Sequence, residues 1–337
     1  MAESTISRGI PQFDDLPLGK DDPPYSAWGL YGKDDELGTL NRLTDAVVVA
    51  AARSEIRTGK RFCLDLPMEP TGNMTFFNRR KFHQEIIREA PPVCCNDEIW
   101  TFNSQGGSQW DGLRHFAYQR EAKFYNGITQ DDIHNLDADG QRTTQNGIQA
   151  MADGGVVGRG VLLDYHGWRQ KQPQDKRKEF DPLKPHVITL DELLQVARDQ
   201  GTEIRFGDIL FVRTGFTLAI QDGDPTAMDA FRAHNDPSWC GVEQTPAMLR
   251  WIWDNFSAVA GDHPTFEVWP ALPPALDHYR MHEILLSGWG MPIGELFALD
   301  AMAEHCAATG RYSFFVTSEP CNVPGGIASP PNILAIF

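Results

Sequence analysis

Hydrophobic residues recur at helical spacing in several stretches of the chain. Apolar side chains after Thr44 share one face, and Gly59 closes that segment. Thr189 and Glu192 have the spacing of a capping box, and Thr245 precedes a proline at the first helical position. The pattern predicts helices over residues 44–58, from 189, from 245, over 277–287 and over 294–309.

Short apolar runs bounded by glycine or proline alternate with these helices. They predict buried strands over residues 161–164, 207–215, 257–261 and 312–316. Residues 66–97 contain four prolines and have mixed polarity, which favours extended segments and loops over a helix. Because strands and helices alternate to the end of the chain, we expect an α/β fold.

Composition predicts an N-terminal arm and argues against nucleic-acid and membrane partners. Residues 1–27 are rich in proline, aspartate and glycine, so we expect them to form an arm on a body of residues 28–337. The net charge of −16 argues against a nucleic-acid partner, which needs clustered lysine and arginine. The sequence shows neither a signal-peptide pattern nor a run of about 18 apolar residues. We therefore expect a cytoplasmic protein with no membrane partner.

Residues 105–115, Gln-Gly-Gly-Ser-Gln-Trp-Asp-Gly-Leu-Arg-His, carry the strongest candidate chemistry. Asp111 and His115 are four residues apart and offer a metal-binding carboxylate and a base for proton transfer. The glycines of this segment suit a backbone that a ligand approaches closely. The segment predicts a functional site in which the neighbouring Trp110 and Arg114 contact substrate or metal. A phosphate-binding loop, a His-Glu-x-x-His motif and a nucleophile elbow are all missing from the sequence.

The segment from Gly107 to His115 resembles the motif His-x-Gly-Thr-His-x-Asp-x-x-x-His of the cyclase superfamily, which includes bacterial-type kynurenine formamidase and isatin hydrolase. The resemblance continues over residues 158–164, 188–193, 207–215, 282–286 and 294–296. The chain is similar to a longer fungal and bacterial branch that has Gln-Trp-Asp-Gly-Leu-Arg-His at the motif. The resemblance implies one α/β domain with a mixed, barrel-like central sheet surrounded by helices. It also implies a homodimer or homotetramer.

Transferred position by position, the resemblance implies a metal site. Asp111, His282 and Glu295 would bind one divalent ion, Zn²⁺, Mn²⁺ or Mg²⁺, and His115 would transfer protons. Without the family, His282 is a histidine on a helix face and Glu295 is an acid in the first turn of a helix.

Gln105 and Gln109 occupy the places of two family histidines. An amide oxygen is a harder and weaker donor than an imidazole nitrogen, so the replacements penalise Zn²⁺ more than Mn²⁺, Mg²⁺ or Ca²⁺. Three states of the site stay open: one metal held without the glutamines, a hard cation held with their help, or no metal.

A second group of polar residues follows the predicted strand at 257–261. Asp262, His263 and Glu267 lie beyond its end, where α/β proteins place ligand contacts, and we predict that they line the pocket.

These residues favour hydrolysis of a small cyclic or aryl amide, lactam or lactone, with a metal-activated water and His115 as general acid and base. The first alternative is a metal-independent lyase, isomerase or cyclase acting on a secondary metabolite. In that case Gln105 and Gln109 would hold a carbonyl or enolate oxygen of the substrate. The second alternative is a small-molecule binder without catalysis.

Overall fold

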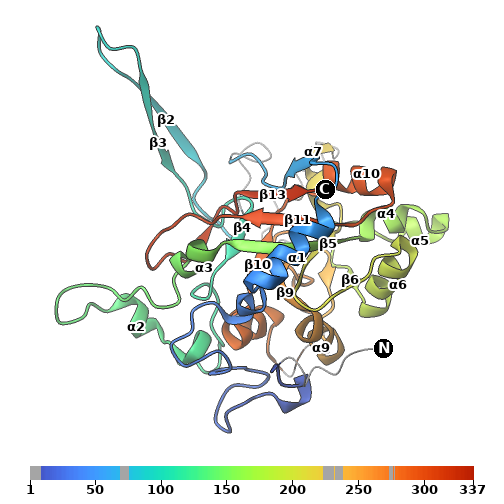
Figure 1. Ribbon diagram of the computed structural model, residues 1–337, viewed down its shortest axis with the longest axis horizontal. Coiled ribbons are helices and arrows are strands. Elements are labelled where there is room, and N and C mark those ends of the chain that lie inside the picture. Colours follow the sequence, from blue (N-terminus) through green and yellow to red (C-terminus); the bar gives the residue numbers. More distant parts are fainter. Residues whose placement is uncertain (1–8, 69–75, 223–230, 232–237, 273–275, 277) are drawn as a thin grey trace.

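A mixed, curled sheet of nine strands lies at the centre of the computed structural model (Figure 1). The structure describes residues 9–68, 76–222, 231, 238–272, 276 and 278–337. In spatial order the strands are β1 (Arg61–Cys63), β13 (Ile333–Ile336), β11 (Ser313–Ser318), β5 (Val156–Asp164), β7 (Asp208–Arg213), β9 (Phe256–Gly261), β10 (Ile293–Glu295), β4 (Gln109–Asp111) and β12 (Ala328–Ser329). Strands β5, β7, β9 and β10 are parallel, and the remaining pairs are antiparallel.

Helices surround this sheet, which confirms the predicted fold of a single α/β domain with a mixed, barrel-like sheet. The α-helices in the described parts of the chain are α1 (Asp45–Glu55), α2 (Gln130–His134), α3 (Gln149–Gly154), α4 (Tyr165–Gln170), α5 (Gln174–Lys178), α6 (Leu190–Gln200), α7 (Phe216–Asp222), α9 (Pro246–Asn255) and α10 (Asp300–Thr309). A separate two-stranded pair joins β6 (Val187–Ile188) to β8 (Gly241–Val242).

Side chains of the central strands alternate between two hydrophobic cores. Leu210 and Val212 of β7 pack in the first core with residues of α6 and α9. Their neighbours Ile209 and Phe211 pack in the second core with residues of α10. Successive side chains of a strand point to opposite faces of the sheet. A parallel strand that is covered on both faces is therefore expected to have apolar residues at consecutive positions.

The predicted helix signals are confirmed where they depend on local chemistry. The side chains of Thr44, Thr189 and Thr245 each accept a hydrogen bond from the first turn of the helix that follows. Thr189 and Glu192 form the predicted capping box. Gly310 ends α10 in the left-handed conformation, with φ 67°, which favours glycine.

The predicted helix over residues 294–309 is wrong at its start. Ile293–Glu295 is strand β10, and α10 begins only at Asp300. A Cβ atom on Gly294 would lie 2.9 Å from the Trp110 ring, so the strand fits there because this residue is glycine. Glu295 is therefore a strand residue opposite Gln109, and not an acid in the first turn of a helix.

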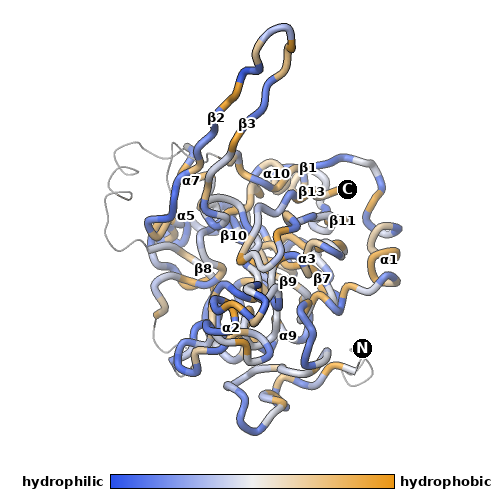
Figure 2. The backbone as a smooth tube through the Cα atoms, turned by 90° about the vertical axis from the view of Figure 1, so that its left-hand side faces the viewer, coloured by the Kyte–Doolittle hydropathy of each residue, from blue (hydrophilic) through white to orange (hydrophobic). Residues whose placement is uncertain are grey.

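Two further segments, the predicted helix at 277–287 and the predicted extended region at 66–97, have the predicted secondary structure in part of their length. The chain becomes helical at Met281 and continues as a π-helical turn over Glu283–Gly288, whereas residue 277 lies outside the described residues. Strands β2 (His83–Arg88) and β3 (Asn96–Thr101) form a hairpin that projects from the body (Figures 1 and 2). Residues 69–75 also lie outside the described part.

The described part of the N-terminal segment, residues 9–27, contacts helix α9. The indole nitrogen of Trp253 donates to the carbonyl of Pro11 at 2.9 Å, and Arg250 pairs with Asp14. Across the described ranges, no helix combines the length and apolar character that a membrane crossing requires.

Glu55, the last residue of α1, connects this helix to the sheet through hydrogen bonds. Its carboxylate accepts hydrogen bonds from Arg159 at 3.0 Å, from Arg311 at 2.8 Å and from Ser313 at 2.9 Å. Burial alone would raise the pKa of Glu55, but the bonds from Arg311 and Ser313 and the charge of Arg159 hold it below its ordinary value of 4.5. The folded protein therefore favours the ionised carboxylate.

We expect Glu55→Gln to lower the free energy of unfolding at pH 7 by about 2 kcal/mol, because hydrogen bonds to a charged group are lost. A lowered pKa stabilises the fold above the ordinary value, and this contribution disappears as the pH falls through the folded pKa. Urea unfolding at a series of pH values should show the difference between variant and wild type shrinking below pH 4.5. A difference that stays constant with pH would contradict the account.

Candidate metal centre and active site

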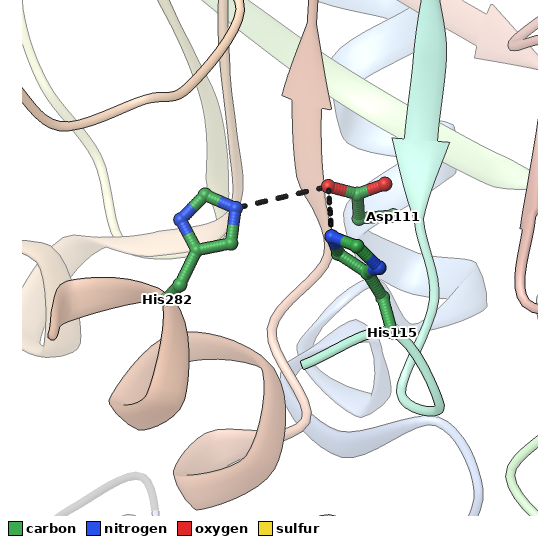
Figure 3. A group of neighbouring side chains, drawn as sticks. All are labelled: Asp111, His115 and His282. Atoms are coloured by element: carbon green, nitrogen blue, oxygen red, sulfur yellow. Dashed lines mark ion pairs between the residues drawn. The ribbon is translucent and has the colours of Figure 1, made fainter. Parts of the chain in front are cut away.

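Two segments that are distant in sequence bring one acid and two histidines to the same place (Figure 3). Asp111 ends β4, His115 lies in the turn that follows, and His282 directly precedes the π-helical turn. The Nε2 atoms of His115 and His282 each lie 3.8 Å from Oδ2 of Asp111. One ligand atom from each of the three residues falls within 4.8 Å of the others, a spacing that suits a metal ion.

The two ring nitrogens of His282 have different surroundings. Its Nδ1 lies 2.7 and 2.8 Å from the two carboxylate oxygens of Glu267, and its Nε2 lies 3.2 Å from Oε1 of Glu295. A carboxylate that accepts the Nδ1 proton leaves Nε2 as the coordinating atom, as in many metal sites. Glu267 therefore orients the imidazole toward Asp111 and Glu295.

The two glutamines hold the carboxylates of the site. Gln105 donates its Nε2 proton to Oδ1 of Asp111 at 2.8 Å, and Gln109 donates to Oε2 of Glu295 at 2.6 Å. Each amide thus occupies one oxygen of a carboxylate and leaves the second oxygen facing His282. The antiparallel pairing of β4 with β10 places Gln109 directly opposite Glu295.

Three buried oxygen atoms of this group accept no hydrogen bond in the described structure, although Nε2 of His282 lies 3.2 Å from the second: Oδ2 of Asp111, Oε1 of Glu295 and Oε1 of Gln109. Leaving a buried acceptor unsatisfied costs about 1–3 kcal/mol, and more for a charged group. A divalent cation satisfies such oxygens together with an imidazole nitrogen. The residues present therefore fit a metal ion.

The pKa values of the group reflect the mutual proximity of buried carboxylates and imidazoles. Burial and the negative charge of Asp111 raise the pKa of Glu295 to about 8. Burial lowers the pKa of His282, but Glu267 and the other carboxylates outweigh it and hold that pKa well above the ordinary value. Burial would raise the pKa of Asp111, yet the charges of His115 and His282 hold it below its usual range.

His115 differs from His282 in both pKa and exposure. Burial lowers the pKa of His115 below its ordinary value of 6.5, although the charge of Asp111 opposes this effect. Its side chain keeps 18% of its exposure, compared with 7% for His282. A neutral imidazole that reaches the cavity can accept a proton at pH 7 and exchange it with solvent.

A cavity of about 250 Å³ lies over this group. Its floor includes His115, Glu267, His282 and Glu295, and its walls combine aromatic rings with two arginines. The walls include Phe77, Phe116, Trp269, Arg79 and Arg280. Pockets that bind drug-sized ligands have volumes of roughly 300–1,000 Å³, so this slightly smaller cavity suits a molecule with one or two rings.

Two of the predicted contacts support the scaffold instead of lining this cavity. Trp110 is fully buried in the second core, and its Nε1 donates to the hydroxyl of Ser318 at 2.9 Å. The guanidinium of Arg114 donates to three backbone carbonyls, those of Thr143, Gln145 and Gly325. These bonds tie the loop after β4 to two neighbouring segments.

Of the second predicted group, Glu267 lines the cavity, whereas Asp262 and His263 are occupied elsewhere. The carboxylate of Asp262 accepts bonds from the backbone of Thr214 and Gly215 at 2.7 Å, and from the Thr214 hydroxyl. Nε2 of His263 lies 2.9 Å from the carbonyl of Phe266. This pair shapes the turn after β9.

Sequence reasoning missed the arginines of the cavity and the residues Phe77 and Trp269. Arg280 lies two residues before His282, and Trp269 lies two residues after Glu267, so proximity to predicted site residues was an available signal. Arg79 and Phe77 come from the proline-rich segment, where no pattern marked them.

We expect Glu267→Gln to weaken metal binding 10- to 100-fold, because the imidazole of His282 loses its anionic partner. Titration calorimetry with Mn²⁺ measures the change. Glu192→Gln is the matched control, since glutamine also serves at this position of a capping box. Equal metal affinity in wild type and Glu267→Gln would show that Glu267 does not orient the ligand.

Comparison with known proteins places the chain in a family. A family model described as "Putative cyclase" matches residues 33–268, so the chain belongs to this cyclase family. A solved structure described as a novel cyclase is 29% identical with a TM-score of 0.77, and the match covers 93% of this chain and 99% of that one. The comparison with curated proteins gives no match.

Isatin hydrolases share the fold at lower identity. Isatin hydrolase A from Ralstonia solanacearum is 17% identical with a TM-score of 0.53, over 87% of this chain and 98% of its own. An isatin hydrolase bound to the product analogue thioisatinate is 16% identical with a TM-score of 0.54, over 87% and 97%.

Proposed function

We propose that this protein is a metal-dependent hydrolase of a small cyclic or aryl amide, lactam or lactone. In this proposal Asp111, His282 and Glu295 bind one divalent ion, and His115 transfers protons. The observation that carries the proposal is the convergence of two unsatisfied carboxylate oxygens on Nε2 of His282, beneath a small aromatic cavity. Two carboxylates and one imidazole suit Mn²⁺ or Zn²⁺ better than Cu⁺, which prefers sulfur ligands.

Each residue has a definite task in this reaction. When bound, the divalent ion supplies Lewis acidity, which polarises a carbonyl and lowers the pKa of water. His115 accepts the proton of the attacking water and returns it to the departing nitrogen or oxygen of the substrate. Glu267 keeps His282 in place, and Gln105 and Gln109 keep the two carboxylates oriented. The aromatic walls exclude water and hold a planar substrate.

The orientation of the glutamines favours hydrolysis over the metal-independent alternative. A lyase or isomerase of that kind requires their amide groups to face a substrate oxygen. The Nε2 atoms of Gln105 and Gln109 instead donate to Asp111 and Glu295, and neither residue lines the cavity.

Chelation and re-addition of metal test the proposal. The protein is incubated with aryl formamides, lactams and lactones of one or two rings, before and after treatment with EDTA. We expect hydrolysis of at least one class, its loss when the metal content falls, and its recovery with Mn²⁺ or Zn²⁺. Activity that survives with less than about a tenth of an equivalent of any divalent metal would overturn the proposal.

A further inference from the structure

Arg280 lies on the wall of the cavity between two aromatic rings. Its guanidinium carbon lies 5.7 Å from the centroid of Phe116 and 5.7 Å from that of Trp269. Cation–π contacts of this kind use the flat face of the guanidinium. They leave the N–H groups on its edge free to donate to a planar acid in a bidentate manner.

The guanidinium of Arg280 has no close ion-pair partner among the described residues, although its charge acts at longer range on Glu283. No described carboxylate lies within 4.0 Å of its guanidinium, and no described residue accepts a hydrogen bond from it. Glu283, three residues after Arg280, accepts hydrogen bonds from the backbone of Arg280 and Gln119 instead. By contrast, Arg213, which is more deeply buried, pairs with Asp164 and Asp300.

The separation between Arg280 and the proposed metal-binding residues limits the size of the small molecule that can contact both. Phe116 contacts both ends of the cavity, since its ring centroid lies 5.6 Å from that of His282 and its face meets Arg280. About one aromatic ring therefore separates the guanidinium from the proposed metal site. The floor is rich in carboxylates and repels an acid, so an acid group on the ligand is favoured at the wall that carries the arginines. Of these, Arg79 already donates to the carbonyl of Gln105 at 2.8 Å, which leaves Arg280 as the better candidate to bind the acid.

We infer that Arg280 recognises an anionic group on the substrate. The substrate class is a small aromatic amide, lactam or lactone with a carboxylate that is separate from the bond to be cleaved. This inference rests on the proposed function for the identity of that bond. Arg280 is then a specificity-determining residue that orients the ring, with the acid at the wall and the carbonyl over His115 and His282.

Binding of a matched pair of probes tests the inference without any turnover. 2-Aminobenzoate and 2-aminobenzamide have nearly the same shape and differ in charge, and their affinities are measured by calorimetry in the presence of a chelator. We expect the wild type to bind the acid at least about tenfold more tightly than the amide, as for one charge-assisted bidentate contact. Arg280→Met should remove this preference and leave amide binding within about twofold, because methionine keeps much of the apolar contact.

Two further variants separate loss of the contact from loss of structure. Arg280→Lys keeps the charge and should retain part of the preference. Arg250→Met is the matched control, because Arg250 also lies over an aromatic ring, that of Phe13, but lies outside the cavity. Equal wild-type affinity for both probes, no binding of the acid at millimolar concentration, or a preference that survives Arg280→Met would each overturn the inference. These binding results do not depend on a metal, so they stay distinguishable from a failure of the proposed hydrolysis.

Discussion

Replacing Asp111 with asparagine should abolish both metal binding and turnover. Oδ2 of Asp111 lies between the Nε2 atoms of His115 and His282, so it is the oxygen that both imidazoles approach. Asparagine keeps the volume and can still accept the hydrogen bond from Gln105 at Oδ1. It removes the charge, and a neutral amide is a weak ligand for a divalent ion. We expect the metal affinity to fall by more than about 100-fold.

Thermal unfolding with and without Mn²⁺ measures this effect and controls for folding. At a metal concentration 100 times Kd, binding to the native state stabilises the wild type by about 2.7 kcal/mol. Metal should therefore raise the Tm of the wild type and leave that of Asp111→Asn unchanged. The metal-free proteins should unfold at similar temperatures. An equal metal-induced shift in both proteins would exclude Asp111 as a ligand.

His115→Gln should separate catalysis from metal binding. Loss of a general acid and base lowers kcat by about 10²–10⁴-fold. His115 also lies within ligand distance of the group, so the same variant decides between two roles for it. If His115 transfers protons, the variant should have the metal content and KM of the wild type and a much lower kcat.

The control for this variant is its metal content, measured beside its steady-state kinetics on any substrate that the wild type hydrolyses. A variant that has lost its metal along with its activity would show that His115 is a ligand. A variant with unchanged kcat would remove His115 from the mechanism. Arg280→Met serves as the contrasting case, because it should change recognition of an acid without changing the metal content.

Helix starts and buried strands were predictable from the sequence because their signals are local. The cap at Thr189 needs only Glu192, three residues away, and β7 is apolar from Ile209 to Val212. The strand β10 was not predictable, because its three residues are held by β9 and β4 from distant parts of the chain. An acid that follows a glycine is also typical of the start of a helix. For this reason the sequence pattern predicted Glu295 in a helix instead of in strand β10.

The candidate site was predictable as a set of residues but not as an arrangement. Family resemblance supplied Asp111, His282 and Glu295, and the structure brings them together. The tasks of Gln105 and Glu267 depend on contacts with side chains that the fold brings near, and no spacing in the sequence encodes those contacts. The same holds for Arg280, whose significance comes from the two rings around it.

The metal content of the wild-type protein tests the central claim most directly. The protein is purified without chelators and analysed for zinc, manganese, iron, magnesium and calcium, as isolated and after incubation with each ion followed by gel filtration. The account predicts about one equivalent of a divalent ion per chain, and its absence from Asp111→Asn. Less than about a tenth of an equivalent in every preparation of the wild type, including those incubated with metal, would contradict it.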